Sequence, residues 1–289
     1  MSKIKISELF YSIQGEGRYM GVPSVFLRTY GCNFTCQGFG MPRGELSKEA
    51  DDIAYTHINI ESFQTYKNLP LVSTGCDSYA SWHPAFKELS PLMEVEGLAK
   101  AIVETLPFKE WRDEHLVITG GEPLLGWQRA YPDLLNQPCM KGLKEITFET
   151  NGTMRLTKEF KEYLKMWNQE RWPHGNGGEI TFSVSAKLPC SGEKWEDAIK
   201  PEVVCDYENY GTAYLKFVIA TEQDFEDAMK ATKEFRDAGF TGHVYLMPVG
   251  GVESVYALNN RAVAIMAMNA GMRYSDRLQV PLFKNEWGT

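Results

Sequence analysis

The stretch "HLVITGG", residues 115–121, is a short run of apolar and β-branched residues that two glycines close. Such a run predicts a buried strand. Five similar runs lie along the chain: "PSVFLRTYG" (23–31), "EITFETNG" (145–152), "EITFSVSAK" (179–187), "AYLKFVIA" (213–220) and "HVYLMPVG" (243–250). Helical segments alternate with the later runs, so we predict an α/β fold with mostly parallel strands, either an open sheet or a full or partial barrel.

Two of the intervening segments have clear helical periodicity. In residues 221–239 one face carries Phe225, Ala228, Met229, Thr232 and Phe235. Thr221 can cap the start of this helix and Gly239 can end it. Earlier in the chain, a second apolar face comprises Val95, Leu98, Ala99, Ile102 and Leu106.

Polar and turn residues gather where the predicted strands end. They are Arg28, residues 119–123, residues 149–152, residues 185–187, and Met247 with Pro248. Because the carboxyl ends of parallel strands meet at one edge of a sheet, we expect these residues to share a pocket.

The length of 289 residues fits one domain, 1–289, with two interruptions. Residues from about 38 to 75 are too long for an ordinary connection, and residues from about 166 to 179 form a smaller extension. The net charge of −8, without a basic tract, argues against nucleic-acid and membrane-surface binding. There is no apolar segment typical of a signal peptide or membrane span, so we expect a cytoplasmic protein.

The cysteines include one pair at a spacing typical of metal sites. Cys32 and Cys36 begin a C-x3-C pattern, but the position where a third cysteine would complete C-x3-C-x2-C is Phe39. Cys76, in "STGCDSYASW" (73–82), is the next cysteine along the chain. Soft thiolates favour an iron–sulfur cluster. The alternatives are a Cys-rich zinc site that includes Cys76 and a histidine such as His57 or His83, and a purely structural role for these cysteines. Cys139, Cys190 and Cys205 receive no ligand role.

Several of these motifs together resemble the radical S-adenosylmethionine family of 7-carboxy-7-deazaguanine synthases. The matching stretches are "FYSIQGEG" (10–17), "CDSYA" (76–80), "ITGGEPLL" (118–125), "FETNGT" (148–153), "SVSAK" (183–187), "LMPVG" (246–250) and "RLQVPLFKNEWGT" (277–289). The resemblance implies a partial (β/α) barrel. It also implies that Cys76 is the third ligand of a 4Fe–4S cluster, displaced by the 38–75 insertion.

The resemblance also assigns roles to individual residues. The substrate-binding residues are expected to be Ile13, Gln14, Gly15, Glu16, Arg28 and Thr119. S-adenosylmethionine is expected to contact Gly121, Glu122, Ser185, Ala186, Lys187, Met247, Pro248, Val249 and Gly250. Ser78 stands where the family carries a Mg²⁺ ligand, and its hydroxyl oxygen suits that cation.

The implied activity is a lyase reaction of 7-deazaguanine and queuosine biosynthesis. It converts 6-carboxy-5,6,7,8-tetrahydropterin to 7-carboxy-7-deazaguanine with loss of ammonia, and S-adenosylmethionine is used catalytically. The family implies a flavodoxin- or ferredoxin-type electron donor and a homodimer. Two alternatives remain: a radical activase acting on a partner protein, and a non-catalytic metal-binding protein on the same scaffold.

Overall fold

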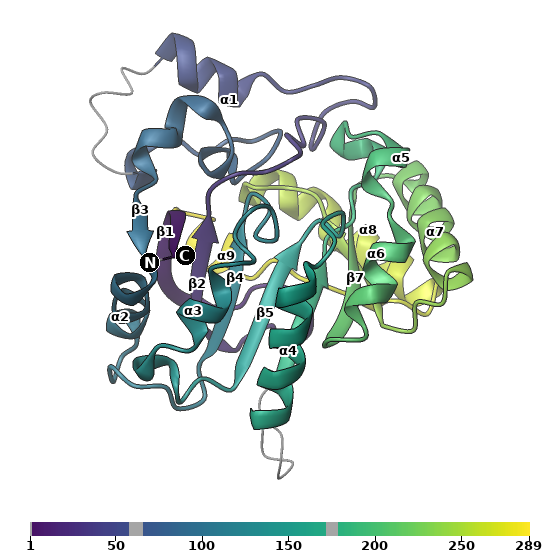
Figure 1. Ribbon diagram of the computed structural model, residues 1–289. Coiled ribbons are helices and arrows are strands. Elements are labelled where there is room, and N and C mark those ends of the chain that lie inside the picture. Colours follow the sequence, from purple (N-terminus) through teal and green to yellow (C-terminus); the bar gives the residue numbers. More distant parts are fainter. Residues whose placement is uncertain (1, 58–65, 172–178) are drawn as a thin grey trace.

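The fold is organised around one large sheet. The computed structural model describes residues 2–57, 66–171 and 179–289, and within these it has a nine-stranded sheet of order β3-β1-β2-β4-β5-β6-β7-β8-β9 (Figure 1). The strands are β1 (Lys3–Ile13), β2 (Pro23–Thr29), β3 (Leu92–Glu94), β4 (His115–Gly120), β5 (Glu145–Thr150), β6 (Glu179–Val184), β7 (Thr212–Ile219), β8 (Val244–Pro248) and β9 (Arg273–Tyr274).

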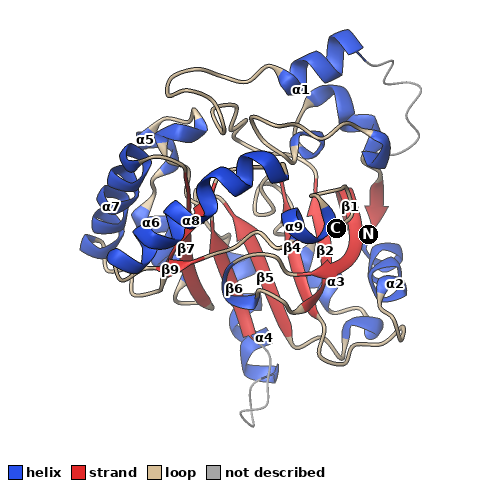
Figure 2. Ribbon diagram, turned by 180° about the vertical axis from the view of Figure 1, so that it is seen from behind, coloured by secondary structure: helices blue, strands red, loops and turns tan. Residues whose placement is uncertain are grey.

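Helices flank this sheet, as Figure 2 shows by colour. The α-helices are α1 (Glu49–Asp52), α2 (Val95–Thr105), α3 (Tyr131–Leu135), α4 (Lys158–Arg171), α5 (Trp195–Ala198), α6 (Pro201–Tyr207), α7 (Glu222–Asp237), α8 (Glu253–Asn269) and α9 (Gln279–Phe283). The short 3₁₀ turns and one π turn are η1 (Gly17–Tyr19), η2 (Ile53–His57), η4 (Tyr66–Asn68), η5 (Tyr79–Ser81), η6 (Pro84–Leu89), η7 (Pro138–Met140) and η8 (Pro189–Ser191).

The strand directions confirm the predicted fold class. From β2 to β9 every neighbouring pair is parallel, whereas β1 pairs antiparallel with both β2 and β3. The six predicted strands are all present. β1, the long first strand, was missed. Its antiparallel register places Glu8 opposite Arg28 on β2.

The two predicted helices form as α2 and α7. Thr221 caps α7 through a reciprocal capping box with Asp224, and Gly239 follows the helix with a φ of +105°. One detail of the predicted apolar face was wrong, because Met229 is 41% exposed. Ala231 lies on the buried side of α7 instead.

The described residues of the 38–75 insertion, 38–57 and 66–75, lie beyond the ends of β2 and β4 and include α1 (Figure 1). Its two ends meet, because Gly75 N donates a 2.7 Å hydrogen bond to Phe39 O. A separate apolar cluster anchors the insertion, in which Ile53, Leu69 and Val72 pack with Tyr79 and Phe86. The described part of the insertion is therefore a folded layer on the barrel rather than an extended linker.

The smaller extension begins inside the last turns of α4, which runs to Arg171. Residues 172–178 lie outside the described ranges, so most of the predicted extension does too. Among the described residues, no helix combines the length and apolar character needed to cross a lipid bilayer.

Candidate active site

The residues predicted for the site converge on one cavity of about 250 Å³. The predicted residues that line it are Ile13, Gln14, Gly15, Glu16, Arg28, Cys32, Cys36, Cys76, Ser78, Thr119, Gly121, Ser185, Lys187, Met247, Val249 and Gly250. In-register parallel pairing produces this convergence, since Arg28 on β2 lies opposite Thr119 on β4. The prediction that the strand ends share a pocket is thus confirmed.

Three predicted cofactor residues do not line the cavity: Glu122, Ala186 and Pro248. Glu122 is fully buried, and its carboxylate accepts hydrogen bonds from Leu124 N, Thr150 Oγ1 and Asn151 N at 2.7 to 3.0 Å. Burial raises the pKa of this carboxyl group despite those donors. Glu122 therefore joins the loops after β4 and β5, and its side chain is not free to contact a ligand in the cavity.

The three thiols of Cys32, Cys36 and Cys76 face one part of the cavity and pack against Phe34 and Phe39. Burial raises the pKa of Cys32 to about 12 and also raises the pKa values of Cys36 and Cys76, and the neighbouring thiols add to the shift of Cys32 and Cys36. The thiols are thus neutral on their own, and a metal that binds thiolates would release their protons.

The backbone at the first cysteine pair is strained, and a carboxylate holds it in place. Cys36 has a φ of +50°, a left-handed conformation that is unfavourable for a side chain of this kind. Glu193 holds it, because one of its carboxylate oxygens accepts hydrogen bonds from Thr35 N at 2.9 Å and from Cys36 N at 2.8 Å. The strained turn is therefore secured from outside the cysteine motif.

A preformed metal site would bring several ligand-type side chains together. In the described part of the chain, no three side chains of His, Cys, Asp or Glu converge on one point. A 4Fe–4S cube binds each thiolate at a different iron, so its ligands stand farther apart than those of one ion. The ring nitrogens of His83 contact Ala85 N and Asp51 rather than Cys76, and the side chain of His57 lies outside the described part.

A glycine cradle and a lysine border the thiols. A Cβ at Gly121 would lie 2.7 Å from Cys32 Cβ, so only glycine allows this approach of the backbone to the cysteine turn. On the other side, Lys187 Nζ donates a 3.0 Å hydrogen bond to Ser185 Oγ. The ammonium of Lys187 also lowers the pKa of each of the three thiols, against the larger effect of burial. The cradle and the cation together suit a ligand with a carboxylate.

Gln14 and Glu16 reach the cavity from the opposite direction to the cysteines. They follow the antiparallel strand β1, and the chain after them contacts the start of β6, where Tyr19 Oη lies 3.2 Å from Glu179. The side-chain amide of Gln14 donates a 3.1 Å hydrogen bond to Glu149, which also lines the cavity. Hydrogen-bond donors and acceptors therefore meet in the part of the cavity formed by the residues after β1, which we call its inner end.

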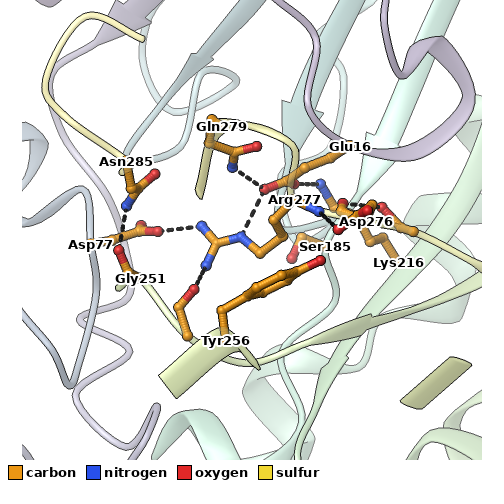
Figure 3. A network of polar contacts seen from close by, with 12 residues as sticks. Glu16, Asp77, Ser185, Lys216, Gly251, Tyr256, Asp276, Arg277, Gln279 and Asn285 are labelled. Atoms are coloured by element: carbon orange, nitrogen blue, oxygen red, sulfur yellow. Dashed lines mark hydrogen bonds and ion pairs between the residues drawn. The ribbon is translucent and has the colours of Figure 1, made fainter. Parts of the chain in front are cut away.

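Glu16 is the centre of a buried polar network (Figure 3). Lys216 on β7 forms an ion pair with Glu16 Oε2. Arg277 Nε lies 3.1 Å from Glu16 Oε1, and Gln279 Nε2 donates to the same oxygen at 2.9 Å. Arg277 also pairs with Asp77 at 2.5 Å and donates to Gly250 O. A single arginine thus joins the segment after β1, the cysteine loop and the turn after β8.

This network fixes the charge of Glu16. Burial favours the neutral acid, but the cations Lys216 and Arg277 outweigh it and lower the pKa of Glu16. Glu16 in turn raises the pKa of Lys216, although burial acts the other way. Glu16 is therefore a carboxylate, an acceptor for the N–H groups of a ligand.

Arg28 forms an ion pair with Glu8 through Nε and donates from Nη1 to Ser78 Oγ at 2.8 Å. The contacts described for Arg28 leave Nη2 for a ligand. Burial raises the pKa of Glu8, and its Oε1 is one of the buried atoms without a hydrogen-bond partner among the described residues. Ser78 Oγ accepts from Arg28 and donates to Asp77 at 3.3 Å, so a cation bound by Ser78 would use the remaining lone pair of this oxygen.

Several polar residues that line this cavity were given no role from the sequence, among them Glu8, Asp77, Lys216, Arg277 and Gln279. Lys216 offered a signal, because it is a charged residue within the apolar run "AYLKFVIA" and is only 4% exposed. Glu149 was among the noted strand-end residues but was given no role. Arg277 opens the matched motif "RLQVPLFKNEWGT" but was given no role, since its partner Glu16 is 261 residues away.

The fold and the cavity together define a class of protein. A mostly parallel, barrel-like sheet with a polar cavity at its strand ends is typical of (β/α)-barrel enzymes. The fold is similar to the crystal structure of QueE from Escherichia coli, with a TM-score of 0.52, 18% identity, and coverage of 94% of this chain and 93% of that chain. No protein-family model matches the chain.

The sequence relatives are more specific, and they confirm the resemblance drawn from the motifs. The chain is similar to 7-carboxy-7-deazaguanine synthases. That of Halobacterium salinarum is 29% identical and matches over 98% of this chain and 91% of the relative. That of Pyrobaculum aerophilum is 24% identical over 99% and 97%. That of Rhodopirellula baltica is 26% identical over 100% and 90%.

Proposed function

We propose that this chain is a radical S-adenosylmethionine enzyme that forms 7-carboxy-7-deazaguanine from 6-carboxy-5,6,7,8-tetrahydropterin. One observation carries the proposal: a single cavity joins three thiols and a glycine cradle to a buried, charged inner end. The relatives named 7-carboxy-7-deazaguanine synthase support it, because their similarity extends over nearly the whole chain.

The thiol end of the cavity suits the cofactors. Cys32, Cys36 and Cys76 would hold a 4Fe–4S cluster and leave one iron open. The backbone at Gly121 and the ammonium of Lys187 would hold the amino-acid end of S-adenosylmethionine. Bound together and reduced, these groups supply the carbon radical that starts the reaction. The aromatic rings of Phe34 and Phe39 pack against the thiols and so limit the access of water to them, while Cys32 and Cys76 stay partly exposed.

The inner end of the cavity suits the pterin. The carboxylates of Glu16 and Glu149 can accept N–H groups from its ring, while Gln14, already bonded to Glu149, offers an amide with both a donor and an acceptor. The Nη2 of Arg28 can bind the substrate carboxylate. Substrate would thus be fixed at two ends, which orients the ring carbon to be attacked.

The C-terminal residues complete the cavity wall. Trp287, Gly288 and Thr289 line it, and Trp287 Nε1 donates a 2.8 Å hydrogen bond to Leu69 O of the insertion. Leu71 and Val72 of the insertion line it as well. We infer that the insertion and the C-terminus together cover the bound substrate and exclude solvent.

The remaining roles are also proposals. Ser78 is proposed as a Mg²⁺ ligand together with substrate oxygens. We further propose a flavodoxin- or ferredoxin-type electron donor, a homodimer and a cytoplasmic location, and we expect no nucleic-acid or membrane partner.

Anaerobic turnover tests the proposed function. The full chain is reconstituted with iron and sulfide, then incubated with 6-carboxy-5,6,7,8-tetrahydropterin, S-adenosylmethionine and a reductant. We expect 7-carboxy-7-deazaguanine by mass spectrometry, with many product molecules per S-adenosylmethionine consumed. Cleavage of S-adenosylmethionine without pterin turnover would favour an activase, and no cleavage would favour a non-catalytic metal-binding protein. Either result contradicts the proposal.

A further inference from the structure

The displaced cysteine raises a geometric problem that the structure resolves. In a C-x2-C spacing, two intervening residues keep the second and third cysteines together. Here residues 37–75 separate Cys36 from Cys76. A chain of this length samples many positions for Cys76 unless other contacts restrict it. The contacts that restrict it lie at the base of the insertion.

The carboxylate of Glu49 is the centre of those contacts. Its Oε2 accepts a hydrogen bond from Ser73 N at 2.7 Å. Its Oε1 lies 2.6 Å from Ser73 Oγ, 3.1 Å from Thr74 N and 2.6 Å from Thr74 Oγ1. Two backbone amides and two hydroxyl groups therefore converge on one side chain, two and three residues before Cys76.

The segment that carries Glu49 is itself tied to the first cysteine pair. Ser47 N donates a 2.7 Å hydrogen bond to Gln37 O, directly after Cys36. Ser47 Oγ lies 2.7 Å from Thr74 Oγ1. A continuous path of hydrogen bonds thus runs from Gln37 through Ser47 and Glu49 to Thr74, in place of the missing short covalent spacing.

The donors hold Glu49 as a carboxylate. Partial burial acts to raise its pKa, but the hydrogen bonds from Ser73 and Thr74 lower the pKa overall. Glu193 has the same kind of contact with the turn that carries Cys36, where it accepts hydrogen bonds from Thr35 N and Cys36 N. One carboxylate on each side thus fixes a cysteine-bearing turn.

We propose that Glu49 is a positioning residue that holds Cys76 at the distance from Cys36 required for cluster binding. The proposal rests on the proposed function, because it takes Cys76 as the third ligand. The insertion thus separates Cys76 from Cys36 along the sequence, and the residues at its start hold Cys76 close to Cys36 in space.

The first test uses the full chain without a cluster, under anaerobic reducing conditions. The labelling rate of each cysteine with N-ethylmaleimide is followed by peptide mass spectrometry. Glu49→Gln keeps the shape but removes the charge, and we expect about a tenfold faster labelling of Cys76 from the loss of charge-assisted hydrogen bonds. Labelling of Cys32 and the melting temperature should stay as in the wild type. Glu45→Gln, which changes an exposed acidic residue of the same segment, is the matched control.

The second test adds iron and sulfide. Glu49→Gln should lower the fraction of chains with a four-iron cluster and alter its electron paramagnetic resonance spectrum, and Glu49→Asp should restore part of both. Thr74→Val, which removes one hydroxyl donor, should act in the same direction but less strongly. A role in general stability alone would leave the spectrum of the folded fraction unchanged.

Two results would overturn the proposal. In one, Cys76 of Glu49→Gln is labelled at the wild-type rate. In the other, the labelling rates of all three thiols rise together and the melting temperature falls. A wild-type cluster that protects Cys32 and Cys36 from labelling but leaves Cys76 reactive would overturn it as well. Failure of the proposed function has a different signature: the reconstituted wild type forms no 7-carboxy-7-deazaguanine, while Glu49→Gln still speeds the labelling of Cys76 in the cluster-free chain.

Discussion

Arg277 offers the sharpest test of how the cavity is held together. Its side chain is 11% exposed and joins Glu16, Asp77 and the carbonyl of Gly250. Replacing it with Gln leaves two carboxylates without this cation, and breaking a buried pair typically costs about 3–5 kcal/mol. Asp77 is 34% exposed and Glu16 keeps its contact with Lys216, so we expect the lower end, about 3 kcal/mol.

Thermal and urea unfolding at pH 7 measure this loss. For a chain of this size, about 3 kcal/mol corresponds to a melting temperature lower by roughly 5–10 °C. Arg277→Lys keeps the charge but cannot bridge three partners, so its loss should be smaller. Arg261→Gln, an exposed arginine on α8, should change stability by less than about 0.5 kcal/mol. A loss below about 1 kcal/mol for Arg277→Gln would refute the network as the support of the cavity.

The pH dependence of the same variant gives an independent check. Burial alone would raise the pKa of Glu16, but Lys216 and Arg277 lower it overall, so its contribution to stability is present above the ordinary carboxyl range and is lost as the pH falls through the lowered value. Without Arg277 the pKa of Glu16 rises. The free energy of unfolding of Arg277→Gln should therefore be lower at pH 7 and should fall less than that of the wild type as the pH drops from about 5 to about 2, and an equal fall would contradict this account of Glu16.

Three further outcomes are expected. Burial lowers the pKa of His115 to about 3, whereas the unfolded chain takes up that proton below about pH 6.5. The stability of the wild type should therefore fall as the pH drops through this window. In the His115→Gln variant, the melting temperature should fall less over the same pH range. Trp287→Ala loses the hydrogen bond to Leu69 and the ring contact with Tyr79, and should lower the free energy of unfolding by about 2 kcal/mol; an unchanged denaturant midpoint would remove the C-terminus from the structural core. Arg28→Ala should weaken pterin binding far more than S-adenosylmethionine binding in calorimetry, and equal weakening would show that its place is misassigned.

The sequence predicted most of the sheet because its parallel strands are buried on both faces. Such strands read as continuous apolar runs, as in β4, whose residues from His115 to Thr119 are all buried. β1 was missed because charged and polar residues are interspersed along it, including Lys5 and Glu8. Met229 was misplaced because helical periodicity alone does not say how far an apolar face extends into solvent.

The site was predictable where chemistry depends on local motifs and unpredictable where it depends on long-range pairing. Short patterns brought Gln14, Cys32 and Gly121 to the cavity correctly. Lys216 and Arg277 escaped because their role comes from a shared partner, Glu16, that lies 200 and 261 residues away along the chain. Glu122 was given a ligand role from a motif, while its buried carboxylate joins two loops instead.

The position of the third cluster ligand is the central claim, and counting iron and sulfide tests it most directly. After anaerobic reconstitution, the wild-type chain should hold about four irons and four sulfides. Ala substitution of Cys32, Cys36 or Cys76 should abolish that content, whereas Cys139→Ala and Cys205→Ala should retain it. A Cys76→Ala variant with a full complement of iron and sulfide, or a wild-type chain with stoichiometric zinc and no sulfide, would contradict the account.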